Sequence, residues 1–362
     1  QSRLGKNINL YEVPDEESVD IDDYADWTIC EMRLNRKRIV IRTDGYPEIG
    51  LGHIYRSILL FDNLTEHEVL IVVSGKSGLG MEKLDRRFIR YQVVKDDAAF
   101  VELLKKERPD VLINDILDTT EDYMSAVKPW AERIVNIEDM GEGSHLANAV
   151  INALYEKNSS DEQYFWGHRY YCLRDEFLIT GPKAFSEEVK QVLIVFGGTD
   201  PGKYTEKVLS VIRSMPAELP VVYQFVLGLG FNRDEEFMNA VAQCEQDIRV
   251  IKDVKVISTY MAESDIAISS QGRTMYELAT MKVPTIILAQ NDRETTHEFG
   301  YMKNGFINLG NGGEVEEDTL RETLLWLIHT PQIRKQMKES MAKLNLSGGI
   351  RRVKRIILES NK

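Results

Sequence analysis

Short apolar runs alternate with helical stretches from residue 37 to the end of the chain. The first run, at 38–42, ends in the turn Thr43-Asp44-Gly45, and apolar residues then recur at helical spacing. Further strands are expected at 69–73, 111–113 and 134–137, with helices at 97–107 and 120–131. This rhythm is typical of βαβ units and predicts a parallel sheet.

The alternation of strand-like runs and helical stretches breaks at 180–183 and resumes at residue 192. Residues 317–360 are expected to be helical, with a glycine break at Gly348-Gly349. Because 362 residues suit two domains of roughly 150 residues each, we expect two doubly wound α/β domains. The second series predicts strands at 192–196, 221–227, 248–251, 266–268 and 285–288, and helices at 203–213, 234–245, 274–281 and 294–303.

The expected domains are an N-terminal Rossmann-like domain at 37–182, a C-terminal nucleotide-binding one at 183–345, and a helix at 346–362 that returns to the first domain. Residues 1–36 hold nine acidic side chains against four basic ones, so we interpret them as a solvated arm or linker. In doubly wound folds ligands bind at the carboxyl ends of the strands. A substrate between the domains should therefore contact both sets of loops.

Charge and composition narrow the classes of function. The formal net charge of −13 argues against a nucleic-acid or anionic-membrane binder but leaves room for a local phosphate site. Three distant cysteines exclude a disulfide framework and fit a reducing cytoplasm. No apolar run approaches the roughly 20 residues of a membrane span. Neither histidines nor carboxylates have the spacing of a metal site, so we expect no metal or other cofactor.

The first candidate site is the glycine-containing loop from Gly45 to Arg56, between the first strand and the first helix. Glycines let a ligand approach the backbone, and the helix N-terminus offers free N–H groups. His53, next to Gly52, is well suited to proton transfer near neutral pH, and Asp44 lies on the same loop. The alternative is a histidine that only caps the helix or packs in the core.

A second glycine turn, Gly197-Gly198-Thr199-Asp200, follows the first strand of the second domain. Two glycines followed by Thr and Asp suit a tight turn into a helix. The turn lies at the carboxyl end of a strand, near the expected cleft. A turn with an N-cap and no ligand is the alternative.

The third candidate runs from Gly272 to Glu277, where the strand at 266–268 meets a helix. Free N–H groups at the helix start, the hydroxyl of Thr274 and the charge of Arg273 favour a diphosphate site. Glu277 lies three residues after Thr274. It therefore either caps its own helix or accepts hydrogen bonds from ribose hydroxyls.

In their order and spacing, these stretches resemble the UDP-sugar hydrolases of pseudaminic acid biosynthesis, relatives of the MurG-type glycosyltransferases with the GT-B fold. The resemblance covers about residues 37–358 and implies two Rossmann-like domains facing a central cleft. It is carried by Arg42-Thr43-Asp44 with Ile49-Gly50-Leu51-Gly52-His53 and Arg56, by Tyr170 to Phe177, by Phe196 to Pro201, by Gly272-Arg273-Thr274 with Glu277, by Asn291, and by Ser347-Gly348-Gly349 to Arg352-Val353.

The resemblance also implies an activity, the metal-independent hydrolysis of UDP-2,4-diacetamido-2,4,6-trideoxy-β-L-altrose to UDP and free sugar. His53 matches the histidine that activates water, and Thr274, Glu277 and Asn291 match positions that contact the nucleotide. One segment departs from the family, because Asn114-Asp115-Ile116 stands where Asp-His-Tyr is usual. We expect Asp115 either to contact the substrate or to replace His53 as the general base. A GT-B glycosyltransferase and a catalytically impaired nucleotide-sugar-binding domain are the alternatives.

The acidic arm has a resemblance of its own. Residues Pro14 to Asp22, with Asp26-Trp27, are similar to the tail of the CMP-acylneuraminate cytidylyltransferases. This resemblance implies that the chain is the carboxyl-terminal part of a bifunctional cytoplasmic protein, with a cytidylyltransferase before the hydrolase. The sequence predicts a UDP-sugar as the substrate and indicates no oligomeric state.

Overall fold

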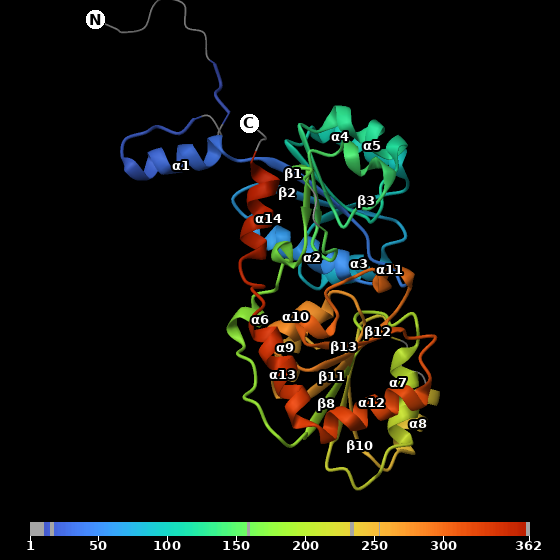
Figure 1. Ribbon diagram of the computed structural model, residues 1–362. Helices are drawn as coiled ribbons and strands as arrows, with labels where there is room; N and C mark the ends of the chain where they lie inside the picture. Colours follow the sequence, from blue (N-terminus) through green and yellow to red (C-terminus); the bar gives the residue numbers. More distant parts are fainter. Residues whose placement is uncertain (1–10, 15–17, 158–159, 232–234, 253, 360–362) are drawn as a thin grey trace, which may run out of the picture.

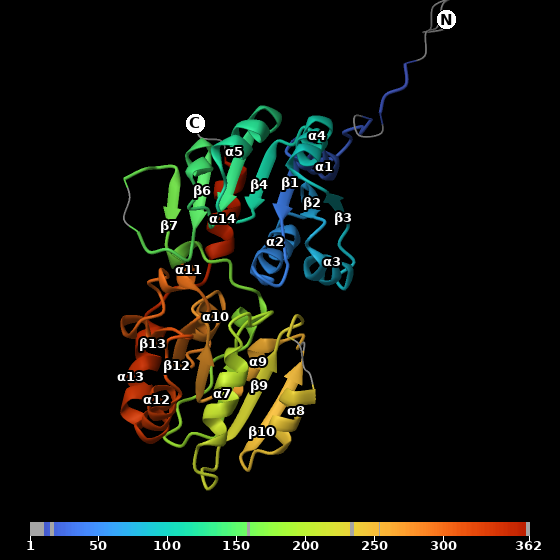
Figure 2. The same ribbon diagram turned by 90° about the vertical axis from the view of Figure 1, so that its right-hand side faces the viewer.

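The computed structural model describes residues 11–14, 18–157, 160–231, 235–252 and 254–359. Within these residues the chain forms two parallel β-sheets, each flanked by helices and stacked one above the other in Figure 1. Figure 2 shows that the strands of both sheets run toward the junction between them. We call each sheet with its helices a half of the molecule. The predicted fold class, α/β with two Rossmann-like units, is confirmed.

The first half is built on a sheet with the strand order β3-β2-β1-β4-β5-β6-β7. Its central strands are apolar runs rich in Val and Ile and are buried on both faces, which is typical of a parallel sheet covered by helices. The strands are β1 (Arg38–Thr43), β2 (Glu68–Ser74), β3 (Tyr91–Val94), β4 (Val111–Asp115), β5 (Arg133–Ile137), β6 (Ala149–Asn152) and β7 (Tyr164–Trp166), and the helices are α2 (Gly52–Asn63), α3 (Gly78–Asp85), α4 (Asp97–Glu107) and α5 (Glu121–Val127).

The second half repeats this plan with the strand order β10-β9-β8-β11-β12-β13. Each strand again pairs in parallel with its neighbours, and helices lie between successive strands. The strands are β8 (Gln191–Val195), β9 (Val222–Leu227), β10 (Asp247–Lys252), β11 (Ile266–Ser269), β12 (Thr285–Ala289) and β13 (Phe306–Asn311), and the helices are α6 (Glu176–Ile179), α7 (Tyr204–Arg213), α8 (Glu235–Ala242), α9 (Ile257–Glu263), α10 (Thr274–Thr280), α11 (Asp292–Thr295), α12 (Glu317–His329) and α13 (Pro331–Ala342).

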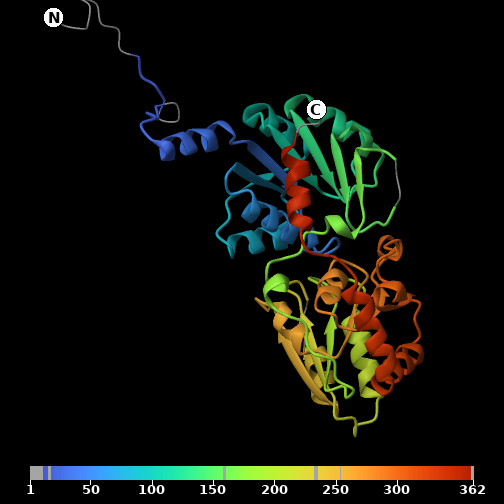
Figure 3. The ribbon, with the colours of Figure 1, turned by 60° about the vertical axis from the view of Figure 1, so that its left-hand side comes forward.

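The last helix, α14 (Gly349–Leu358), returns from the second half to the first. It contacts α2, β4 and β6, and Figure 3 shows it lying along the first sheet. Val353, Ile356 and Ile357 are buried in the core of that half. The carboxyl end of the chain therefore ties the two halves together.

The structure differs from the hydrophobic pattern in several elements. It adds β3, β6, β7 and β13, which are short or partly exposed and so lack a strong apolar signal. The helix expected at 294–303 is wrong, because α11 ends at Thr295 and only the 3-10 turn Met302–Asn304 follows. Among the described residues, no helix has both the length and the apolar character needed to cross a membrane.

The predicted arm contains a helix, α1 (Tyr24–Leu34), that stands apart from both halves in Figures 1 and 3. Asp23 and Asp26 form a capping box at its start, which explains why this acidic segment is locally helical. None of its residues is buried. The described part of the arm is thus exposed to solvent, as expected, and part of it is helical.

Candidate active site

A cleft of about 390 Å³ lies between the two halves. The first half lines it with loops that follow β1, β4, β5 and β6, and the second with loops that follow β8, β9, β11 and β12. Doubly wound folds bind their ligands at such strand ends. Most residues that the sequence analysis singled out line this cleft: Gly52, His53, Arg56, Gly198, Thr199, Gly272, Arg273, Thr274, Glu277 and Asn291.

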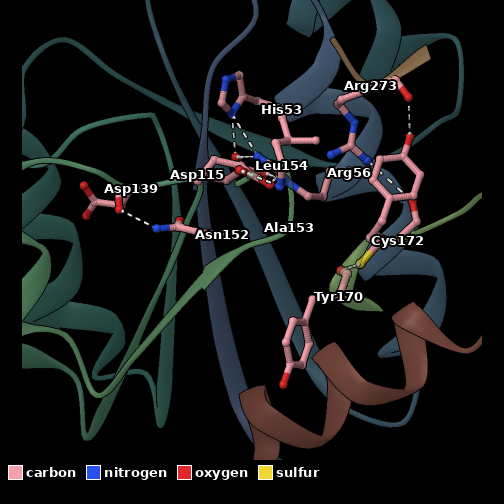
Figure 4. Close-up of polar contacts among 12 residues, drawn as sticks. His53, Arg56, Asp115, Asp139, Asn152, Ala153, Leu154, Tyr170, Cys172 and Arg273 are labelled. Carbon is pink, nitrogen blue, oxygen red and sulfur yellow. Dashed lines mark hydrogen bonds and ion pairs between the residues drawn. The ribbon is translucent and has the colours of Figure 1, made fainter. Parts of the chain in front are cut away.

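His53 lies in the first turn of α2, at the wall of the cleft, with only 8% of its surface exposed. Its Nδ1 atom is 2.5 Å from Oδ1 of Asp115, the last residue of β4 (Figure 4). β1 and β4 are adjacent and parallel, with Thr43 in register with Asp115. The loop that leads from β1 into α2 therefore starts beside the end of β4, and the two side chains meet.

Arg56, one turn along α2 from His53, binds the same carboxylate. Its Nε donates to Oδ2 of Asp115 over 2.7 Å, its Nη2 donates to Oδ1, and its Nη1 donates to Glu138 over 3.2 Å. Burial opposes the ionisation of Asp115, but Arg56 and His53 hold the pKa of this carboxyl well below its usual range. Burial raises the pKa of Glu138, which Arg56 offsets only in part.

The ionised Asp115 fixes the tautomer of His53. A carboxylate without a proton can only accept a hydrogen bond, so Nδ1 of His53 donates to it, and in the neutral imidazole Nε2 carries the lone pair. The imidazole is held in one orientation at the cleft wall. This is the geometry of a general base positioned by a buried carboxylate.

The structure corrects the expectation that Asp44 and Asp115 contact a substrate. Asp115 is fully buried behind His53, so no ligand in the cleft can reach it. Asp44 does not line the cleft either. Its carboxylate accepts a hydrogen bond from the Ser74 amide over 2.7 Å and lies 3.0 Å from the Arg42 guanidinium. Asp44 therefore fastens the loop after β1 to β2.

The glycine turn after β8 caps a helix and also lines the cleft. Asp200 caps α7, because its carboxylate accepts hydrogen bonds from the amides of the first two residues of that helix. Gly198 and Thr199 line the cleft, and a Cβ atom on Gly198 would lie 3.3 Å from Cβ of Leu51 in the first half. The turn thus packs directly against the loop that carries His53.

The loop before α10 brings positive charge to the cleft. No side chain caps this helix, whose first residue is Thr274. Arg273 precedes it and places its guanidinium 4.8 Å from the centre of the Tyr171 ring. Further arginines, Arg56, Arg174 and Arg293, line the same cleft. The described residues contain no group of three or more His, Cys, Asp or Glu side chains that could hold a metal ion.

Glu277 does not cap its own helix, so that alternative is wrong. Nε and Nη2 of Arg174 both donate to its Oε1, over 3.1 and 2.9 Å. Arg174 also pairs with Glu176 over 2.6 Å, so the arginine is fixed between two carboxylates. Because both bonds from Arg174 reach Oε1, they leave Oε2 of Glu277 unused at the cleft wall.

Asn291 caps α11, because its Oδ1 accepts a hydrogen bond from the Glu294 amide over 3.0 Å. Near it, the cleft is lined by polar residues that the sequence analysis did not single out: Glu138, Gln290, Arg293, Glu294 and His297. Their positions after predicted strands could have indicated them, since Glu138 directly follows β5 and the others follow β12. No motif marks them.

The fold is that of GT-B glycosyltransferases. MurG from Acinetobacter baumannii has a TM-score of 0.65 at 11% identity, over 89% of this chain and 99% of that one. The spinosyn rhamnosyltransferase SpnG has a TM-score of 0.59 at 10% identity, over 89% and 99%. MnaA from Staphylococcus aureus, solved with UDP, has a TM-score of 0.57 at 13% identity, over 88% and 96%. These likenesses establish the fold alone.

No family model matches the chain. An uncharacterised protein of Methanocaldococcus jannaschii is 28% identical, over 74% of this chain and 58% of that protein. The spore coat polysaccharide biosynthesis protein SpsG of Bacillus subtilis is 23% identical, over 77% and 86%. A Helicobacter pylori protein named pseudaminic acid cytidylyltransferase and UDP-2,4-diacetamido-2,4,6-trideoxy-beta-L-altropyranose hydrolase is 26% identical, over 52% and 36%. The chain thus matches little more than half of the M. jannaschii protein's length and about a third of the H. pylori protein's length.

Proposed function

We propose that the chain is a sugar-nucleotide hydrolase that splits a UDP-linked deoxy amino sugar into UDP and the free sugar. The observation that carries the proposal is the His53–Asp115 pair at the wall of a cleft rich in arginines. The name of the H. pylori relative, which includes such a hydrolase, supports the choice of substrate. The proposed metal-independent reaction needs only groups that this cleft provides.

In the proposed reaction, water attacks the anomeric carbon while the bond from that carbon to the β-phosphate oxygen breaks. Nε2 of His53 takes a proton from the water, and the ionised Asp115 stabilises the imidazolium that forms. The bonding electron pair leaves with UDP. Arg273 and the uncapped N–H groups at the start of α10 would stabilise the diphosphate. Attack on the face opposite UDP inverts the anomeric carbon.

The first test compares UDP release from UDP-2,4-diacetamido-2,4,6-trideoxy-β-L-altrose by the wild type and by His53→Ala. A positioned general base typically contributes roughly 10²- to 10⁴-fold, so turnover should fall by about that factor while UDP affinity stays nearly unchanged. His329→Ala is the control, because His329 is exposed and does not line the cleft. Equal turnover in the wild type and His53→Ala would refute His53 as the base.

A glycosyltransferase is the second candidate, favoured by the transferases among the structures of the same fold. An acceptor hydroxyl would then replace water, and the sugar would be recovered bound to the acceptor. UDP release that needs no added acceptor supports the hydrolase. Release that appears only with an acceptor supports the transferase.

Glu277 is proposed to bind the ribose of the nucleotide through Oε2. Glu277→Gln should weaken UDP binding about tenfold, because a hydrogen bond to a charged group is worth roughly 1.5–3 kcal/mol. Calorimetric titration with UDP measures this. Glu176→Gln is the matched control, since Glu176 also pairs with Arg174 but does not line the cleft. Equal losses in both variants would mean that Glu277 only holds Arg174.

We also propose that a cytidylyltransferase domain is fused to this chain in a bifunctional cytoplasmic protein. The double name of the H. pylori relative and the resemblance of the acidic arm support this arrangement. The full-length protein should then form a CMP-sugar from CTP and a nonulosonic acid. Absence of that product from a full-length protein that still releases UDP would refute the fusion.

A further inference from the structure

Glu138 is a buried carboxylate at the wall of the cleft, on the side of the first half. It directly follows β5, lines the cleft, and has only 3% of its surface exposed. Nη1 of Arg56 donates to its Oε1 over 3.2 Å, and the Leu154 amide donates to its Oε2 over 3.4 Å. Because Arg56 also binds Asp115, a single guanidinium joins the two carboxylates.

The backbone at Glu138 lies in the left-handed region, with a φ of 56°. Glycine adopts this conformation readily, whereas a residue with a long side chain keeps it only where the surroundings impose it. Here the Glu138 amide donates to the Ile151 carbonyl over 3.0 Å, and the Arg293 side chain donates to the Glu138 carbonyl over 2.7 Å. A glycine would fit this backbone with less strain, so the presence of a glutamate indicates a role for its side chain.

The charges nearest to His53 oppose its protonation unless Glu138 is included. Asp115 attracts a proton to the imidazole, but Arg56 binds the same carboxylate, and its Nη2 atom lies 3.3 Å from Nδ1 of His53. One carboxylate and one guanidinium cancel, so a proton on His53 would leave a net positive charge in a buried site. Such a charge is costly without a partner. A second carboxylate on Arg56 removes the imbalance.

Charged and titratable groups face Glu138 from both halves of the molecule. Burial raises the pKa of its carboxyl, Arg56 and Arg273 lower it, and Asp115 raises it. The neutral titratable groups around it are those of Tyr155, Cys172 and Tyr276. Burial raises the pKa of each of these three groups, so they carry no charge near neutral pH. The balance of charge therefore depends on the two guanidinium groups and the two carboxylates.

We propose that Glu138 is a positioning residue for the general base: its carboxylate balances the Arg56 guanidinium, so that Asp115 can stabilise the imidazolium that His53 becomes. This inference rests on the proposed function, in which His53 takes a proton from water. With both carboxylates ionised, the four side chains together carry one net negative charge, which is cancelled when Nε2 of His53 accepts the proton. In Glu138→Gln the same step would create one net positive charge.

The test measures how readily His53 holds a proton and needs no turnover. Diethyl pyrocarbonate modifies histidine only as the neutral imidazole, so the rate of His53 modification across pH, followed by mass spectrometry of its peptide, reports protonation. In Glu138→Gln the midpoint of this profile should lie about one pH unit below that of the wild type, because a nearby negative charge is lost. Glu48→Gln is the matched control, since Glu48 also lines the cleft but is exposed to solvent. Its midpoint should not move, because solvent screens an exposed charge.

The outcomes distinguish this inference from the proposed function. Equal midpoints in the wild type and Glu138→Gln, in protein of wild-type thermal stability, overturn the inference. Equal shifts in Glu138→Gln and Glu48→Gln also overturn it, because the effect then comes from the overall charge of the cleft. If Glu138→Gln is unstable, Glu138→Gly replaces it, since glycine suits the left-handed backbone, and its midpoint should also fall. A shift confined to position 138 supports the inference even if the wild type releases no UDP, in which case only the hydrolase proposal fails.

Discussion

At the scale of single residues, the candidate site is a set of pairs that lie far apart in the sequence. His53 could be singled out from its glycine loop, and Asp115 from its place at a strand end. Their hydrogen bond depends on the adjacency of β1 and β4, which no local pattern specifies. Glu294 and His297 carry no motif, and only the fold brings both to the cleft, where each is bonded to Gln271.

Asp115→Asn should lower turnover by roughly 10²- to 10⁴-fold, because an amide can donate to Nδ1 and so stabilise the wrong tautomer of His53. UDP affinity should change little, since Asp115 does not line the cleft. Steady-state kinetics and UDP titration measure the two effects. Asp44→Asn is a suitable control, because Asp44 is also buried and paired with an arginine. Equal loss of turnover in both variants would contradict a specific role for Asp115.

At the scale of elements, the sequence predicts best those strands that are continuous apolar runs, such as β1 and β12. β7 has only three residues and β3 is mostly exposed, so neither has the burial that produces a hydrophobic signal. The helix expected at 294–303 is wrong: α11 ends at Thr295, and beyond it the His297 carbonyl and Nδ1 are bonded to Gln271. The short turn that results is the one that carries His297.

Gly349, the first residue of α14, shows how closely the returning helix packs. A Cβ atom there would lie 1.8 Å from the backbone oxygen of Tyr171, on the segment that leads from the first half to the second. Gly349→Ala should therefore destabilise the protein by about 1–3 kcal/mol, because the backbone must shift. Gly78→Ala is the control, since Gly78 also begins a helix and a Cβ atom would meet nothing within 4 Å. Urea unfolding measures both, and equal stability would contradict the packing described.

At the scale of the whole molecule, the site exists only where the two halves face each other. Arg293 of the second half donates to Asp118 over 2.7 Å and to the carbonyl of Glu138 over 2.7 Å, both in the first half. The hydroxyl of Tyr171 donates to the carbonyl of Arg273 over 3.1 Å. These bonds cross the junction beside the cleft, between α2, which carries His53, and the loop before α10.

Asp118→Asn tests whether the Arg293 bridge sets that distance. Exposed ion pairs contribute at most about 1 kcal/mol to folding, so overall stability should hardly change. Loss of up to about 1 kcal/mol of interaction free energy between the two halves should raise KM for the UDP-sugar about threefold to fivefold. It should also increase the radius of gyration measured by X-ray scattering. Asp62→Asn is the matched control, because Asp62 and Arg87 form an equally short and similarly exposed pair within the first half. If both variants keep wild-type KM and dimensions, the Asp118–Arg293 pair does not position the halves, and the cleft is held by α14, the packing of the crossing segments and the bonds to the carbonyls of Glu138 and Arg273.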